Sequence, residues 1–269
     1  MGSIDTVNRA TGAGVPRLRT RTPLDPPPLL TRVKARAVGP RFSVSIMTAS
    51  LALAAALLFL SHALPSWPGV RPALIARLGR GGFVTIHSVG SLLTLTLFVL
   101  AYRAADGGEV VFTPFDWAAP LVAVVMPVVF LLLVARVTTR FGSQSAPNPP
   151  HGIYRLTRAP GSLALLLWAL AHLNATGDGR RVLLFGTMAA IALFALVKNE
   201  IVLGRSPAGR AFRAETSLLP LAGPQGVRGA LAGLAEMGPA RLAGGLAAYG
   251  GMLLLHPWLF GVEPLYWIG

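Results

Sequence analysis

The sequence predicts an all-α fold: a polytopic transmembrane helical bundle of about six spans, preceded by a basic, Pro-rich N-terminal extension. Three observations support this prediction. Hydrophobic residues make up 53% of the chain and charged residues only 13%, against about 25% charged residues in soluble domains. The mean hydropathy is +0.61. Apolar runs recur along the chain, each near the roughly 20 residues that a helix needs to cross the hydrocarbon layer.

The first 41 residues differ from the remainder of the chain. They are rich in Pro, Thr and Arg, and such a composition does not bury enough apolar surface to fold alone. We interpret residues 1–41 as an extension that contacts neighbouring membrane-protein subunits, or else as a tail that folds back on its own loops. An Arg-rich, acid-poor segment is also typical of a transit-type targeting peptide. The first thirty residues lack the apolar core of a signal peptide.

Residues 42–269 form the predicted transmembrane domain. Its spans are Phe42–Leu64, Phe83–Tyr102, Phe115–Ala135, Gly161–Ala175, Val182–Leu203 and Leu242–Val262. The fourth span is short, and Ile153–Tyr154 can extend it around Pro160. Trp and Tyr residues cluster near the span ends, as interfacial aromatic belts do. The long loop 204–241 is interpreted either as an interfacial helix lying on the membrane or as a plain loop, and the orientation of the bundle is left open.

The charge and the cysteine content limit which partners and which kinds of chemistry are expected. Lys and Arg total 24 against 10 acidic residues, and the net charge is +14. Because these cations lie in loops between apolar runs, we expect them to face anionic lipid headgroups and partner subunits and not nucleic acid. The chain has no cysteine, which excludes disulfides, thiolate ligands and nucleophilic thiols. The predicted spans hold too few acidic residues for a coupled ion transporter.

Four of the five histidines lie within or at the edge of a predicted span: His62, His87, His172 and His256. Imidazole is the commonest metal ligand and a proton carrier near neutral pH, and histidines in membrane helices also ligate haem iron. The alternative is a hydrogen bond to a neighbouring helix. The span ends place His62 with His87 on one membrane side and His172 with His256 on the other. At about 1.5 Å per residue, His62 and His172 differ in depth by roughly 20 Å.

Trp168 is the aromatic candidate beside these histidines. It lies on one helical face with Leu165 and His172, because residues three and four apart share a face. Such a wall suits a flat macrocycle or a polyene, and ordinary packing explains it equally well.

Five segments carry a resemblance to a known family. They are SHALPS at 61–66 followed by RLGRGGF at 77–83, GIYRLTRAP at 152–160, LWALAHLNATGDGRRVLLFG at 167–186, AETSLLPLAG at 214–223 and HPWLFGVEPL at 256–265. Together they resemble the NnrU family of bacterial membrane proteins, which extends more distantly to the 15-cis-zeta-carotene isomerases of plants and cyanobacteria. The resemblance covers about residues 45–269 and leaves the basic extension outside.

The resemblance implies a haem b site. Position by position, the essential histidines of the isomerases correspond to His62 and His172, which we expect as axial iron ligands with Trp168 as a pocket wall. His87 and His256 are further cofactor-binding candidates. Where the family has His-Pro, this chain has Ala159-Pro160, so one ligand or proton donor is missing. No catalytic residue is predicted, and whether the chain is an enzyme is left open.

Three functions follow from these observations. We favour an accessory or assembly subunit of a larger photosynthetic or respiratory membrane complex, whose histidines bind haem b, bind chlorophyll or only pack. The alternative is a haem-dependent carotenoid cis–trans isomerase. The third is an accessory protein for nitric oxide or nitrite reduction, because the NnrU branch is associated with denitrification. The expected location is a bacterial inner or intracytoplasmic photosynthetic membrane, ahead of an organellar membrane.

Overall fold

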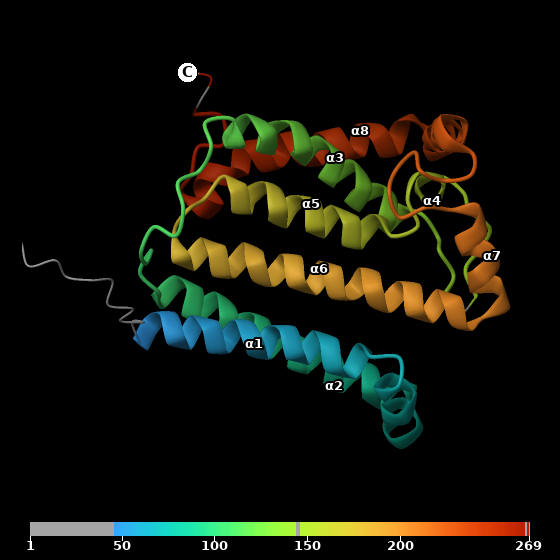
Figure 1. Cartoon of the computed structure of the whole chain (residues 1–269), viewed down its shortest axis with the longest axis horizontal. Helices are drawn as coiled ribbons and strands as arrows, with labels where there is room; N and C mark the ends of the chain where they lie inside the picture. Colours follow the sequence, from blue (N-terminus) through green and yellow to red (C-terminus); the bar gives the residue numbers. More distant parts are fainter. Residues whose placement is uncertain (1–45, 144–145, 267, 269) are drawn as a thin grey trace, which may run out of the picture. The chain divides into compact units, whose positions relative to one another are not determined.

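A computed structural model describes residues 46–143, 146–266 and 268, and every regular element among them is an α-helix. The eight helices of this described part are α1 (Ile46–Ser66), α2 (Val70–Ala104), α3 (Ala118–Thr138), α4 (Ile153–Leu156), α5 (Pro160–Asn174), α6 (Gly179–Arg205), α7 (Pro207–Glu215) and α8 (Gly226–Phe260) (Figure 1). The predicted all-α class is confirmed. The predicted extension, residues 1–41, lies outside the described residues.

Four of the described helices, α1, α2, α3 and α6, are long and apolar enough to cross a membrane. Membrane character is therefore confirmed, but the count of six spans is not. The predicted fourth span corresponds to α5, which has 15 residues and rises about 22 Å, less than the roughly 30 Å of a bilayer core. The predicted sixth span falls in α8, where glycines, His256 and Pro257 dilute the apolar residues.

Two long helices are broken at glycines with positive φ. In α2 the break is at Gly79 (φ 70°, ψ 164°), and in α8 it is at Gly238 (φ 73°, ψ 164°). L-residues rarely adopt this conformation, which glycine reaches without steric cost. Pro239 follows the second break directly, at a helix start where its missing N–H costs nothing. The predicted loop 204–241 is consequently helical over α7 and over the part of α8 before Gly238.

The order in which the helices pack differs from their order in the sequence. The α1–α2 hairpin lies against α6 through α1, while α6 packs on α5, α5 on α3, and α3 on α8 (Figure 1). The short helix α4 packs on α8, and α7 packs on α6. One buried cluster joins α3, α4, α5, α6, α7 and α8, with Tyr154 and Phe212 among its members. A second cluster joins α1 to α2, with Leu51 and Phe98 at its centre and residues of α6 against it.

Candidate functional site

The predicted histidines form two groups at different places in the bundle. His62 of α1 and His87 of α2 make an edge-to-face ring contact, with centroids 6.2 Å apart. The Nδ1–H of His62 donates to the Leu58 carbonyl oxygen at 2.9 Å, which leaves Nε2 as its available nitrogen. The ring of Phe83 stacks on that of His87, with centroids 5.6 Å apart. This first group therefore contains two imidazoles from adjacent helices.

The second group contains His172 of α5 and His256 of α8. Both line one cavity of about 40 Å³, together with Tyr249 and Leu265. The Nδ1–H of His172 donates to the Trp168 carbonyl oxygen at 2.9 Å. The Nδ1–H of His256 donates to the Val262 carbonyl oxygen at 2.8 Å. Each ring again keeps Nε2 available. A cavity of this size holds about one water molecule.

Trp168 lies beside His172, as the helical spacing predicts, and Phe185 of α6 is a second aromatic neighbour. The Trp168 ring lies 5.4 Å from the imidazole centroid, and the Phe185 ring of α6 lies 5.2 Å from it. Trp168 also contacts Phe185 edge to face, with centroids 5.2 Å apart. The three rings pack α5 against α6, so ordinary helix packing accounts for each of these contacts.

The structure does not bring His62 and His172 together. His172 packs on Phe185 of α6, whereas α1 packs on α6 at Phe194, through Phe59. Nine residues of helix between Phe185 and Phe194 span about 14 Å, and His62 lies nearly one turn beyond Phe59. Because a metal ion lies about 2 Å from an imidazole nitrogen, one iron does not reach both side chains in this arrangement.

The volumes of the cavities are a second test of whether haem fits. Pockets for ligands of cofactor size have volumes of about 300–1,000 Å³, far above the 40 Å³ beside His172 and His256. A larger cavity of about 290 Å³ lies between α1 and α6, but its lining is apolar apart from Thr187 and includes no histidine. Neither of these two cavities combines histidine ligands with room for a macrocycle.

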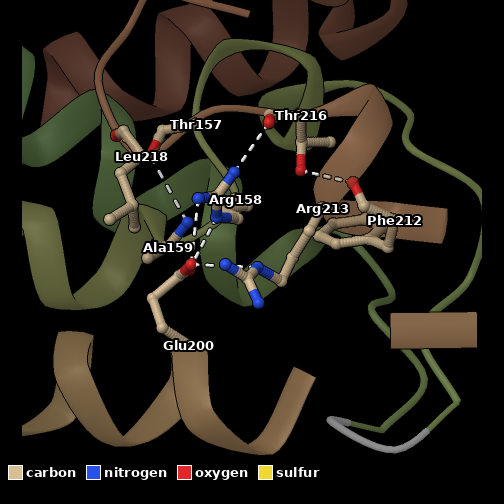
Figure 2. A network of polar contacts seen from close by, with 8 residues as sticks. All are labelled: Thr157, Arg158, Ala159, Glu200, Phe212, Arg213, Thr216 and Leu218. Atoms are coloured by element: carbon tan, nitrogen blue, oxygen red, sulfur yellow. Dashed lines mark hydrogen bonds and ion pairs between the residues drawn. The ribbon is translucent and has the colours of Figure 1, made fainter. Parts of the chain in front are cut away.

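The densest polar cluster described is one that the sequence analysis missed (Figure 2). Arg158, in the turn between α4 and α5, donates from Nε and Nη2 to the two carboxylate oxygens of Glu200 on α6, at 2.6 and 3.0 Å. Arg213 of α7 lies 3.1 Å from the same carboxylate. The remaining nitrogen of Arg158, Nη1, donates to the Thr216 carbonyl oxygen at 2.7 Å. One carboxylate therefore joins three segments of the chain.

Backbone contacts extend this cluster between two of the motif segments. Thr157 donates through Oγ1 to the Leu218 carbonyl oxygen at 2.7 Å. The backbone N–H of Arg158 donates to the Ser217 carbonyl oxygen at 2.8 Å. The motifs GIYRLTRAP and AETSLLPLAG are thus hydrogen-bonded to each other (Figure 2). Ala159, where the resembled family has histidine, is 7% exposed and directly precedes α5. Together these contacts form a clamp that holds the helices to one another.

A second clamp joins α4 to α8 through Glu236. Its carboxylate accepts the Gly152 N–H at 2.7 Å and the Arg155 Nε–H at 2.8 Å. Burial acts to raise the pKa of the Glu236 carboxyl, but the Gly152 N–H and the Arg155 guanidinium outweigh it, so the pKa lies below the usual glutamate value. The carboxylate form is therefore the form that this contact stabilises.

We expect Glu236→Gln to remove an acid-sensitive part of the stability. Because the pKa of Glu236 is lower in the folded chain, its contribution is complete above the usual glutamate pKa of about 4.3. It is lost as the pH falls through the lowered folded value. Thermal unfolding midpoints from neutral pH to about pH 3 should fall less steeply in this variant than in the parent. The effect is small, because the Glu236 side chain is 37% exposed, and an identical pH dependence in the two proteins would contradict it.

Comparison with known proteins found one matching family. The family model described as NnrU protein matches residues 50–264. The matched range contains both histidine groups and both clamps. No curated protein matches the chain, and no solved structure does.

Proposed function

We propose, from the premise that this chain belongs to the NnrU protein family, that it is an accessory or assembly subunit of a larger photosynthetic or respiratory membrane complex. The charged residues of the two clamps pair with one another and hold helices together, which favours a structural role over catalysis. The observation that carries the proposal is the open surface of α2.

Helix α2 has an outer face without a helical neighbour in the described part of the chain. It packs mainly against α1, and its most apolar stretch is only 11% buried, compared with 28% in α1 and α3. The α2 outer face includes Gly81, Thr85, Ser88, Leu92, Thr96 and Val99, all exposed. At 100° per residue these positions fall within about 80° of one another.

Small and hydroxyl-bearing residues are typical of helix–helix interfaces inside membranes, because they let two backbones approach and hydrogen-bond. A Cβ atom added at Gly81 would meet no atom within 4 Å, so this part of the face is open to a partner helix. The α2 outer face thus supports a docked subunit, and the proposed contact through residues 1–41 is a separate part of the same proposal.

The test is co-purification from native membranes with a C-terminally tagged chain. We expect the parent to migrate as part of a larger assembly, and the double variant Thr85→Leu/Ser88→Leu to migrate as the free chain. Val124→Leu on α3 is the matched control, because Val124 is 72% exposed and lies outside the α2 outer face. Deletion of residues 1–41 tests the extension separately. Migration of the parent as a free chain, or of the double variant within the assembly, would contradict the proposal.

A second candidate is haem b ligation, which the carotenoid isomerase alternative requires. The neighbouring positions of His62 and His87 support it, because two imidazoles on adjacent helices can supply both axial ligands of one iron once their ring contact opens to admit the macrocycle. The purified chain would then show a Soret band that His62→Ala and His87→Ala each abolish, whereas His256→Ala leaves it intact. If His172→Ala and His62→Ala abolish it instead, the ligands are the pair implied by the resemblance. Without any Soret band, this candidate fails and the accessory role is unaffected.

A further inference from the structure

Three cations gather around the turn between α1 and α2. Arg71 lies in the first turn of α2, while Lys198 and Arg205 lie in the last part of α6. Arg205 donates from Nη1 to the Pro68 carbonyl oxygen at 3.2 Å. Arg71 is close enough to Lys198 to act on it electrostatically. We call Arg71, Lys198 and Arg205 the basic corner.

The positive charge of the basic corner has no carboxylate partner among the described residues. All four ion pairs of this part of the chain involve other cations. Glu200 is the one acidic residue of α6, but at 100° per residue it lies about 160° around the helix from Lys198. It faces Arg158 and Arg213, which occupy its carboxylate. The half-buried Lys198 therefore forms no ion pair with a carboxylate in the described part of the chain.

An apolar groove lies on the same side of α6 as the basic corner. This is the cavity of about 290 Å³ between α1 and α6, whose lining includes Ala55, Phe59, Gly186 and Thr187. At 100° per residue, Thr187, Lys198 and Arg205 lie within about 20° of one another around α6. The groove and the basic corner therefore follow each other along one stripe of the helix.

Aromatic rings fill the stretch between the groove and the basic corner. Phe194 of α6 contacts Phe59 of α1, with centroids 6.0 Å apart, and Trp67 of the α1–α2 turn, with centroids 5.9 Å apart. Trp67 is 43% exposed, as an interfacial tryptophan is at headgroup level. The order along the stripe is thus apolar groove, aromatic rings, then cations.

We propose that this stripe binds one anionic phospholipid, with its phosphate at the basic corner and an acyl chain in the groove between α1 and α6. Charge complementarity selects the headgroup, because Arg and Lys bind phosphate through charge-assisted hydrogen bonds and attract anionic lipids near the membrane surface. The apolar groove takes the chain. Free phosphate shares the headgroup chemistry, so the experiment separates the two sources.

The test uses the full chain, purified in detergent and delipidated, with the thermal unfolding midpoint as the readout. We expect short-chain phosphatidylglycerol to raise the midpoint, and phosphatidylcholine of the same chain length to leave it unchanged. In the double variant Lys198→Gln/Arg205→Gln, half-saturation should need roughly 25-fold more phosphatidylglycerol, at about fivefold for each cation. Arg228→Gln is the control, because Arg228 is an exposed cation of α8, and it should bind as the parent does.

A third variant tests the groove. A Cβ atom at Gly186 would meet no atom within 4 Å, so Gly186→Leu places a side chain in the groove without a backbone clash. We expect weaker phosphatidylglycerol binding and an unchanged response to inorganic phosphate. An equal shift with phosphatidylcholine, or parent-like binding by the double variant, would overturn the proposal. A full shift with inorganic phosphate alone would overturn the lipid assignment and leave a free-phosphate site.

Discussion

Glu200→Ala is expected to lower the free energy of unfolding by about 3 kcal/mol, as removal of one partner of a buried ion pair does. The side chains of Arg158 and Glu200 are 13% and 21% exposed. Without the carboxylate, the guanidinium groups of Arg158 and Arg213 lose their shared partner, and neither forms another ion pair in the described part of the chain. The clamp should open, because Glu200 of α6 is the shared partner of Arg158, in the turn before α5, and of Arg213 on α7 (Figure 2).

Denaturation of the detergent-solubilised protein measures this effect. Glu215→Ala is the matched control, because Glu215 is an exposed acid at the end of α7 and forms none of the four described ion pairs. It should stay within about 0.5 kcal/mol of the parent, as surface substitutions usually do. Equal losses in the two variants would show that the Glu200 clamp does not hold the helices.

Gly233→Leu is expected to cost about 1–3 kcal/mol, the usual range for overpacking a close contact. In α8, a Cβ atom at Gly233 would lie 2.6 Å from the Gly152 carbonyl oxygen and 2.6 Å from Cδ1 of Leu156. Backbone cannot yield as a flexible side chain does, so α4 has to move away from α8. That movement also separates Gly152 and Arg155 from Glu236.

Ala232→Leu is the control for this substitution. Ala232 precedes Gly233 on α8 and is exposed, so the larger side chain meets no packed neighbour there. Thermal unfolding should distinguish the two variants, and the acid sensitivity that depends on Glu236 should diminish in Gly233→Leu alone. A Gly233→Leu protein with parent-like stability and acid sensitivity would mean that α4 and α8 are not in close contact.

Local patterns predicted the helices well wherever the apolar run was long. The predicted span Val182–Leu203 corresponds to α6 (Gly179–Arg205), and Phe115–Ala135 corresponds to α3 (Ala118–Thr138). Such runs depend on residues close in sequence, so periodicity and composition suffice. The predicted span Phe83–Tyr102 lies in the part of α2 that follows the break at Gly79, whereas the helical segment before the break was not predicted.

The contacts between segments distant in the sequence could not be predicted without the tertiary structure. Glu200 and Arg158 are 42 residues apart in the sequence, and nothing in either motif indicates that one carboxylate serves Arg158 and Arg213 together. The depth estimate from span ends placed His62 beside His87, as the structure does. The haem pair implied by resemblance, His62 with His172, stays a prediction that a visible spectrum tests.

Composition and periodicity alone established an all-helical membrane chain, and its motif segments predicted the family that the comparison confirmed. These properties depend on the residues themselves and on neighbours within a few turns. Tertiary structure alone decided which side chains meet: the clamp at Glu200, the two histidine groups, and the alignment of the basic corner with an apolar groove. The reason is geometric, because these contacts depend on how helices distant in sequence are rotated and shifted against α6.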